Sequence, residues 1–389
     1  MIAGLMVMLL LTGWHTFADF LGEVRQRPAH ERAAVVRSYL LGRGTPIIEQ
    51  DSLLTFVWFG RADSAMVNGD LQDGWRSPAR MTKIPCGNEA RAPALFYRTY
   101  VVPPDARIEY KFVIDGVYTL DSTNHRATLP GDFVNSEAGM PAFRASMIPA
   151  YRPSVAHGHV DTLAFPIAGT PIRPRRILVY VPPGYNHLAE LPSVYVHDGE
   201  SVLQYGYMAN SIDNLIADGA LPPIIAVFVP PVEREEEYAG RKLPEFIDAI
   251  CDQLVPLIDT TYRTACEPGK RGVMGISSGG HVALMAAILR PETFACAAGQ
   301  SSQITPALRV ALSLRQHCTP LPSTTRFWLD WGTYDIVDRD YNLPSQNREL
   351  RDELTRQGIP HRGGEVHEGH NWANWRDRMP DILRYFFLR

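Results

Sequence analysis

Hydrophobic and polar positions follow three successive patterns along the chain. Over residues 19–41 apolar residues recur at the three- to four-residue spacing of a helix. Between residues 52 and 143 the period changes to two, and short runs are separated by turn sequences rich in Asp, Gly and Pro. The strand-like runs are 54–59, 95–101 and 109–114. These patterns predict a helical preface over residues 19–44 and a small β-sandwich domain over residues 45–150.

From residue 160 onward, strand-like runs alternate with helix-like runs. The expected strands are 177–181, 193–197, 224–229, 272–275 and 326–330, and the expected helices are 208–218, 243–259, 280–289 and 346–357. Such alternation predicts an α/β fold, in which a mostly parallel sheet is covered by helices on both faces. We assign residues 151–389 to this domain, with an irregular linker at its start.

Composition narrows the class of protein. The 389 residues suggest two domains, and 45% hydrophobic and 21% charged residues are ordinary values for a globular protein. The formal net charge of −4 argues against nucleic acid as a partner, because phosphate-binding domains are normally basic. The five cysteines are scattered and form no CxxC pair, so neither a disulfide scaffold nor a zinc knuckle is expected.

The N-terminus carries an uncharged, mostly apolar run at Ile2–Leu11. It is too short to span a bilayer, which takes about 20 residues, and no other segment approaches that length. It fits the core of a signal peptide, and Thr16-Phe17-Ala18 resembles a cleavage site, although no basic residue precedes the run. We therefore expect a signal peptide over residues 1–18 and a periplasmic or secreted protein. The alternatives are an ordinary N-terminal helix, or a misplaced start codon, in a cytoplasmic protein.

A G-x-S-x-G motif at Gly275–Gly279 is the strongest chemical signal. A predicted strand precedes it and an Ala-rich helix follows, as a nucleophile elbow requires. Glycines on either side of Ser277 let the backbones pass closely while the serine side chain projects at the edge of the sheet. We therefore expect Ser277 to be a nucleophile and the Ser278 amide to be an oxyanion donor. The alternative is a glycine-rich turn without catalysis.

A nucleophilic serine needs a base, which in this fold follows it in the chain. Five histidines follow Ser277, and three are unsuitable, because one lies in the elbow helix and two precede a strand. Those three are His281, His317 and His361. Of the remaining two, His370 is preferred over His367, because Gly369 allows a sharp loop before the last helix.

The base needs an orienting carboxylate, expected in the loop after the strand at 326–330. Asp335 lies beyond the end of this strand, and Asp338 and Asp340 are alternatives in the same loop. Asp330 is expected to lie too deep in the strand. The order Ser277, Asp335, His370 is that of an α/β-hydrolase triad.

Two further loops follow predicted strands at the same edge of the sheet. Gly199 and Glu200 follow the strand ending at residue 197, and one of their amides is expected to be the second oxyanion donor. Arg234 follows the next strand and is a candidate to bind an anionic or catechol-rich substrate. The alternative is a salt bridge to Glu237, or an arrangement in which Glu237 positions Arg234 for the substrate. No H-E-x-x-H pattern occurs, and neither a metal nor another cofactor is expected.

These residues resemble a known family. The C-terminal part of about 230 residues is similar to the α/β-hydrolase esterases that include enterochelin (siderophore) esterases and family 1 carbohydrate esterases. The resemblance lies in the segments Tyr180–Tyr185, His197–Gly199, Arg234–Tyr238, Pro256–Thr264, Gly275–Gly280, Gly332–Asp335 and Gly369–Trp372. It implies Ser277 as nucleophile, Asp335 as orienting acid and His370 as base. Asp70–Trp75 and Asp115–Asn124 resemble the immunoglobulin-like early-set domain that precedes many of these esterases.

Three functions follow from the sequence and this resemblance. The first is a serine esterase of the enterochelin type, and the second is a feruloyl or acetylxylan esterase whose β-sandwich contacts the glycan. The third is an acyltransferase or a non-catalytic binding protein on the same scaffold. The expected partner is a small-molecule or glycan ester. The sequence leaves open the physiological ester and the oligomeric state.

Overall fold

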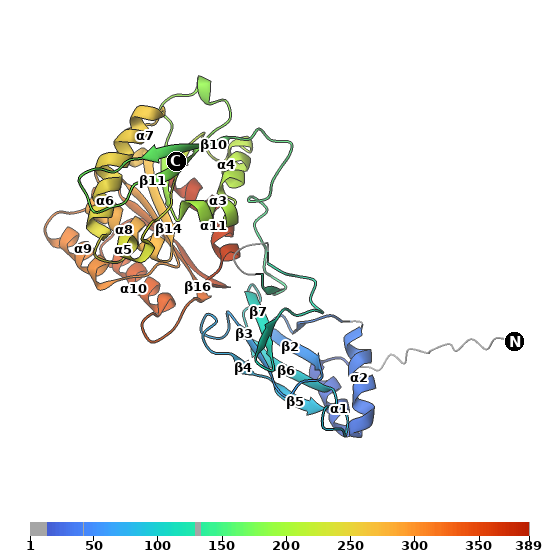
Figure 1. The fold of residues 1–389 in the computed structure, drawn as a ribbon. Coiled ribbons are helices and arrows are strands. Elements are labelled where there is room, and N and C mark those ends of the chain that lie inside the picture. Colours follow the sequence, from blue (N-terminus) through green and yellow to red (C-terminus); the bar gives the residue numbers. More distant parts are fainter. Residues whose placement is uncertain (1–13, 42, 129–133, 389) are drawn as a thin grey trace. The chain divides into compact units, whose positions relative to one another are not determined.

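A computed structural model describes residues 14–41, 43–128 and 134–388 of the chain, and these residues form two compact units (Figure 1). The first unit holds the described residues up to Gly69, together with Ser77–Ala127 and Asn135–Ala142. The second holds Asp70–Arg76 and nearly all of the chain from Phe143 onward. No helix in the described part of the chain is long and apolar enough to cross a membrane.

Two antiparallel sheets and two helices make up the first unit. The helices are α1 (Phe17–Gln26) and α2 (Ala29–Leu41). One sheet has the strand order β1 (Ile47–Glu49), β2 (Leu53–Gly60), β6 (Ala94–Val101), β5 (Thr82–Pro85). The second has the order β4 (Ala79–Arg80), β3 (Ala65–Gly69), β7 (Arg107–Ile114), β8 (Val117–Thr119), and β9 (Ser136–Gly139) also pairs with β7. The helices pack on the first sheet, where Phe20, Tyr39, Val57 and Leu95 share one buried cluster. Helices and strands thus occur where the periodicity predicts them.

Helix α1 begins within the segment that resembles a cleavage site. Thr16 caps the helix by accepting a hydrogen bond from the Asp19 amide, and the Asp19 side chain accepts one from the Thr16 amide in return. The Phe17 amide donates to Glu49 at 2.7 Å. Thr16–Ala18 is therefore folded as the start of a helix. The apolar run at residues 2–11 lies outside the described residues, and the signal peptide stays a prediction.

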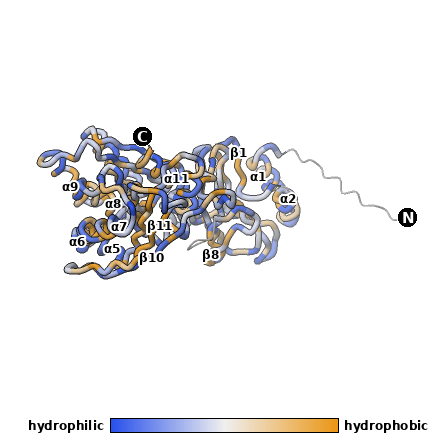
Figure 2. The backbone as a smooth tube through the Cα atoms, turned by 90° about the horizontal axis from the view of Figure 1, so that it is seen from above, coloured by the Kyte–Doolittle hydropathy of each residue, from blue (hydrophilic) through white to orange (hydrophobic). Residues whose placement is uncertain are grey.

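The second unit has an eight-stranded sheet. Its strand order is β10 (His159–Phe165), β11 (Arg175–Val181), β13 (Ile225–Val229), β12 (Ser193–His197), β14 (Arg271–Ile276), β15 (Cys296–Gln300), β16 (Arg326–Tyr334), β17 (His361–Gly369). Strands β12 to β17 run parallel to one another, while β11 pairs antiparallel with β10 and β13. This arrangement confirms the predicted α/β fold, and Figure 2 shows hydrophobic residues in the interior of this unit, around β11 and α8.

Helices cover both faces of this sheet. They are α3 (Gly199–Tyr205), α4 (Met208–Ala217), α5 (Arg234–Tyr238), α6 (Leu243–Ala249), α7 (Val255–Thr261), α8 (Ser278–Leu289), α9 (Pro306–His317), α10 (Leu343–Arg356) and α11 (Trp372–Phe387), with short helical turns at Tyr185–His187 and Pro268–Lys270. Helix α8 is buried in the core of one face, and α4 and α11 pack in the core of the other. The two cores fix the strand ends on which the site is built.

The structure contains several elements that the sequence did not predict, among them β10 and α9, and two departures have a clear physical reason. The helix expected over residues 243–259 is split by a π-helical segment, Ile250–Leu254, just before Pro256. Proline has no amide hydrogen to donate and disturbs regular α-helical bonding. Strand β15 was not expected, because its small Ala and Gly residues have low strand propensity. Burial between two strands and two helical layers makes it a strand nevertheless.

Candidate active site

The G-x-S-x-G motif forms a strained turn between β14 and α8. Ser277 has φ +57° and ψ −123°, a conformation that L-residues rarely adopt. A Cβ atom on Gly275 would lie 2.2 Å from the Gly279 carbonyl oxygen, so the turn needs glycine there. The Ser277 amide donates to the Gln300 carbonyl at 2.8 Å, which ties the turn to the neighbouring strand. This is the geometry expected of a nucleophile elbow.

His370 and Asp335 form a hydrogen-bonded pair beside this turn. Asp335 follows β16 and is buried, and its Oδ1 bonds to Nδ1 of His370, which follows β17. Its carboxylate also accepts from the Ile336 amide at 3.0 Å and the Gly332 amide at 3.2 Å. Burial alone would raise the pKa of Asp335, but the charge and hydrogen bond of His370 and the other donors hold it below its usual value.

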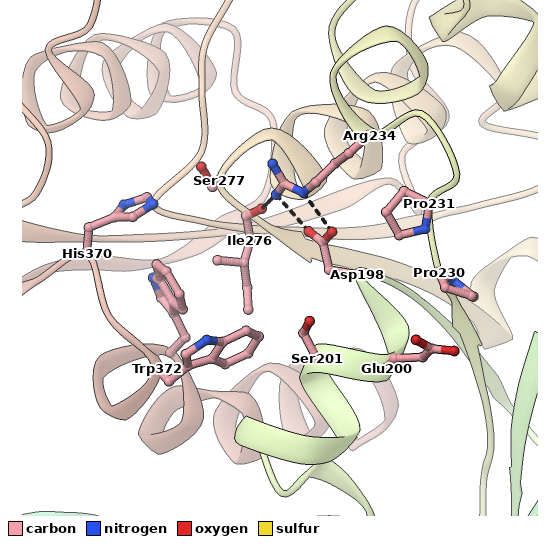
Figure 3. A pocket seen from close by; sticks show the side chains of 11 residues that line it. Asp198, Glu200, Ser201, Pro230, Pro231, Arg234, Ile276, Ser277, His370 and Trp372 are labelled. Atoms are coloured by element: carbon pink, nitrogen blue, oxygen red, sulfur yellow. Dashed lines mark hydrogen bonds and ion pairs between the residues drawn. The ribbon is translucent and has the colours of Figure 1, made fainter. Parts of the chain in front are cut away.

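Ser277 and His370 line one pocket at the carboxyl edge of the parallel sheet. The pocket has a volume of about 460 Å³, and Figure 3 shows the His370 ring pointing toward the side of the pocket that carries Ser277. The lining residues are Asp198, Glu200, Ser201, Pro230, Pro231, Arg234, Ile276, Ser277, His370, Trp372 and Trp375. The pocket thus combines a candidate nucleophile and base with an aromatic wall and a charged pair.

That charged pair consists of Arg234 and Asp198. Nε and Nη2 of Arg234 donate to the two oxygens of Asp198 at 2.8 Å each, a bidentate geometry visible in Figure 3. The arginine side chain is 36% exposed, so it remains accessible from the pocket. Asp198 precedes Gly199, and its own φ is +56°.

Glu237 does not pair with Arg234, so both the alternative of a salt bridge and the arrangement in which Glu237 positions Arg234 for the substrate are wrong. Glu237 is fully buried and accepts two hydrogen bonds from Arg175 of β11, at 2.7 and 2.8 Å. The two residues are three apart in the five-residue helix α5, but Glu237 turns into the core while Arg234 lines the pocket. Glu237 is therefore not among the lining residues, and its role is to join α5 to β11.

The candidate oxyanion donors lie at the first turns of two helices. Gly199 and Glu200 begin α3, and Ser278 begins α8. The first amides of a helix have no intrahelical acceptor and can donate to a ligand. Gly199 packs so closely that a Cβ there would lie 2.5 Å from the Phe228 backbone. Gly199 and Glu200 thus open a helix rather than lie in a loop, and the oxyanion role of these amides stays a prediction.

The other titratable candidates lie elsewhere. Asp330 is buried within β16, as expected, and Asp338 accepts hydrogen bonds from the Asp340 and Tyr341 amides of its own loop. His281 is buried in α8, where burial lowers its pKa to about 4, and it faces Thr305. His367 lies inside β17 rather than after it. Among the described residues, no group of three His, Cys, Asp or Glu side chains is arranged to hold a metal ion.

Several pocket residues were not identified from the sequence. Trp372 and Trp375 lie on the first turn of α11, which Asn371 caps by accepting from the Asn374 amide. Their three-residue spacing after a capping residue is a signal that could have placed both on one face of a helix. Pro230 and Pro231 follow β13 and had no such signal, since prolines after a strand are common in loops.

Fold and site together define an α/β-hydrolase with a serine elbow and a paired histidine and aspartate. The family model described as "Putative esterase" matches residues 169–386, more than half of the chain. The chain therefore belongs to this family, whose class is that of the carboxylic-ester hydrolases.

Curated relatives match over limited stretches. The chain is 27% identical over 135 residues to the protein YbbA of Bacillus subtilis, and this match covers 31% of the chain and 53% of YbbA. It is 28% identical over 158 residues to an endo-1,4-beta-xylanase/feruloyl esterase of Xylanibacter ruminicola, covering 37% of the chain and 22% of that protein. The chain thus spans about half or less of the length of these two relatives.

Solved structures resemble the chain more extensively. An enterobactin esterase from Shigella flexneri aligns with a TM-score of 0.67 at 17% identity, covering 90% of this chain and 97% of that one. A ferulic acid esterase from Anaeromyces mucronatus aligns with a TM-score of 0.51 at 18% identity, covering 61% of this chain and 93% of that one. At such identities the likeness is one of fold.

Proposed function

We propose that the protein hydrolyses carboxylic esters through an acyl-enzyme formed on Ser277. The observation that carries this proposal is the convergence, in one pocket, of a strained serine elbow and a histidine paired to a buried aspartate. His370 takes the proton of Ser277, whose Oγ attacks the ester carbonyl, and Asp335 holds the imidazole and stabilises its protonated form. The protonated His370 gives this proton to the departing alcohol, and it then takes a proton from a water molecule, whose oxygen attacks the acyl-enzyme and releases the acid.

The tetrahedral oxyanion would rest on backbone amides at two helix starts. The Ser278 amide is one donor, and the amide of Gly199 or Glu200 is the other. A single donor of this kind is typically worth about 3–4 kcal/mol in the transition state. Because these donors belong to the backbone, side-chain substitutions at Ser278 or Glu200 leave them in place.

For the substrate, we propose an ester of the enterochelin type. Two observations support this choice: the enterobactin esterase aligns with 90% of the chain, thus reaching into both units, and the guanidinium of Arg234 faces a pocket with an indole wall. A planar cation and an aromatic surface suit polyphenolic or anionic acyl groups.

A feruloyl or related carbohydrate esterase is the second candidate. It is favoured by the match to the xylanase/feruloyl esterase and by the ferulic acid esterase fold, which aligns with 61% of the chain. In that case the first unit, which we propose to be immunoglobulin-like, would contact the glycan. Export to the periplasm or medium remains part of both proposals, and the N-terminal sequence of the protein isolated from cell fractions would test it.

The experiment is a hydrolysis panel on the full chain. Enterobactin-like trilactones, feruloylated and acetylated oligosaccharides and p-nitrophenyl esters are compared by kcat/KM. A fluorophosphonate probe should label Ser277, and Ser277→Ala should lose both labelling and turnover, by about 10³- to 10⁶-fold. Ser302→Ala, a buried serine near the elbow, is the matched control. Undiminished turnover in Ser277→Ala, or labelling at another residue, would refute the triad.

A further inference from the structure

Residues 300–303, at the end of β15 and directly after it, contact both the candidate nucleophile Ser277 and β16, the strand that precedes Asp335. The Gln300 carbonyl accepts from the Ser277 amide at 2.8 Å, and the Gln303 amide donates to the Ser277 carbonyl at 3.3 Å. Between them, the Ser301 amide donates to the Asp330 carbonyl of β16 at 2.7 Å. The segment is therefore held between the elbow and the strand that ends at the triad acid.

Ser301 is fully buried and has a left-handed backbone, with φ +48°. Such a conformation is unfavourable for an L-residue and is common only for Gly, Asn and Asp. A serine persists there only because its surroundings fix it. Its side chain is consequently held in one place, immediately beside β16.

The Ser301 hydroxyl lies between Trp375 and Asp335. Trp375 Nε1 donates to Ser301 Oγ at 2.9 Å. An indole N–H is only a donor, so the hydroxyl accepts from it and keeps its own hydrogen for another partner. We take the Asp335 carboxylate as that partner, because Ser301 is among the neighbours whose side-chain hydrogen bonding lowers the pKa of Asp335. The direction of both hydrogen bonds is thus determined by the donor chemistry.

The same indole also contacts the base. The rings of Trp375 and His370 meet edge to face, with centroids 4.7 Å apart and planes at 89°. Trp375 thus touches both His370 and Ser301, and His370 is hydrogen-bonded to Asp335. A hydrogen bond from the Ser301 hydroxyl to Asp335 would close a circuit of four side chains.

We propose that Ser301 is a positioning residue of this site: its hydroxyl, oriented by the Trp375 indole, holds the Asp335 carboxylate against His370. This inference rests on the proposed function, because it concerns the same triad. Physically, Asp335 is a buried carboxylate whose hydrogen bonds fix its orientation, and hydrogen bonds to a charged group are stronger than those between neutral groups. Without the Ser301 hydroxyl, only the Gly332 and Ile336 amides would hold the carboxylate beside its bond to His370, and its orientation toward the imidazole should be less well fixed.

The test compares two neighbouring buried serines in the full chain. Ser301→Ala removes the hydroxyl from Asp335, whereas Ser302→Ala removes one that has no hydrogen-bond partner among the residues the structure describes. For p-nitrophenyl acetate, Ser301→Ala should lower kcat roughly 10- to 100-fold with little change in KM. The far-downfield proton resonance of His370 Nδ1–H should shift or broaden in this variant. Ser302→Ala should keep both the turnover and the resonance of the wild type.

Ser301→Gly separates the hydroxyl from the backbone. Glycine adopts φ +48° without strain, so this variant should fold at least as well as Ser301→Ala, yet it lacks the same hydroxyl. Equal kcat losses in the two variants support the hydroxyl as the cause. In a double-mutant cycle, Trp375→Phe should lower kcat less in Ser301→Ala than in the wild type, because the part of its effect that runs through the indole N–H and the Ser301 hydroxyl is already lost.

Different results overturn the two proposals. If the wild type is labelled at Ser277 by the fluorophosphonate and hydrolyses esters, but both Ser301 variants keep its kcat and its downfield resonance, the positioning role is refuted alone. If the wild type shows neither labelling at Ser277 nor hydrolysis of any ester in the panel, the proposed function is refuted, and the positioning role with it.

Discussion

Three residues at neighbouring strand ends have a positive φ. Asp198, Ser277 and Ser301 have φ values of +56°, +57° and +48°, and they directly follow β12, β14 and β15. These three strands lie side by side in the sheet. None of the three residues is glycine, so the surrounding contacts must stabilise each of these unfavourable backbone conformations. The strained residues thus lie at the edge of the sheet that carries the pocket: Asp198 and Ser277 line the pocket, and Ser301 packs directly behind it.

At this scale, His370→Ala should lose far more esterase activity than His367→Ala. His370 follows β17 and bonds to Asp335, whereas His367 lies inside the strand. We expect a kcat/KM loss of about 10³-fold or more for His370→Ala and a change within a few-fold for His367→Ala. The check is p-nitrophenyl ester hydrolysis together with melting curves of both variants. The reverse order of the two losses would give the role of base to His367.

Arg234→Lys should change substrate choice more than chemistry. Lysine cannot reproduce the paired hydrogen bonds of a guanidinium, so KM for a large anionic or polyphenolic ester should rise about 10-fold or more. Turnover of small, neutral p-nitrophenyl acetate should change little. The structure supplies the rival account, in which Arg234 serves to hold Asp198 and thus the following amide of Gly199. In that case kcat falls for both esters alike, which would remove Arg234 from substrate recognition.

At the scale of elements, a buried ion pair joins α5 to β11. Arg175 and Glu237 form two hydrogen bonds of 2.7 and 2.8 Å, and their side chains are 2% and 0% exposed. The Arg175 guanidinium also lies over the Phe246 ring, 5.1 Å from its centroid. Helix α5 begins with Arg234, so this pair also sets the position of one wall of the pocket.

Removing one partner of this pair should destabilise the protein. Glu237→Ala leaves the Arg175 charge buried without its carboxylate, and such losses typically cost about 3–5 kcal/mol. The melting temperature should therefore fall by several degrees, and activity toward all esters should decline together. Glu237→Gln, which keeps the shape and one acceptor oxygen, should fall less. A normal melting temperature combined with altered substrate preference would instead return Glu237 to the substrate site.

For the whole molecule, Asp330 makes stability depend on pH. Burial in β16 raises the pKa of this carboxyl from 3.8 to about 6, although Arg378 and hydrogen bonds from Trp328 and Gln300 oppose the rise. The folded state therefore holds a proton that the unfolded chain releases at lower pH. Stability should fall as pH rises from about 4 to about 6 and should stay lower above that range.

Asp330→Asn should remove this dependence. The asparagine cannot ionise, so the variant should gain stability relative to the wild type between pH 4 and pH 7, by about 3 kcal/mol at most. Calorimetric melting temperatures at the two pH values check the prediction. Asp381→Asn, at an exposed aspartate on α11, is the control and should show a constant difference from the wild type. A constant difference for Asp330→Asn as well would mean that Asp330 does not titrate in this range.

Local sequence was sufficient where one residue pattern determines one conformation. Alternating apolar runs predicted β2, β6 and β7 and most strands of the parallel sheet, because a buried strand selects for its side-chain period. The glycines around Ser277 predicted the elbow, because few other residues allow backbones to pass so closely. Chain order and strand ends led to Asp335 and His370, which the structure brings together.

Tertiary structure decided what depends on partners distant in the chain. Glu237 pairs with Arg175, which lies 62 residues earlier in the chain, although Arg234 is nearer in sequence. Arg234 pairs instead with Asp198, which lies 36 residues away in the chain. No local pattern in the sequence pointed to Ser301 as a site residue. Its proposed role depends on two residues distant in the chain, Trp375, which lies 74 residues away, and Asp335. The sequence alone determined the periodic elements and the glycine-dependent turn of this protein. The pairing of buried charges and hydroxyls was decided by the tertiary structure, because only the folded sheet brings these partners within hydrogen-bonding distance.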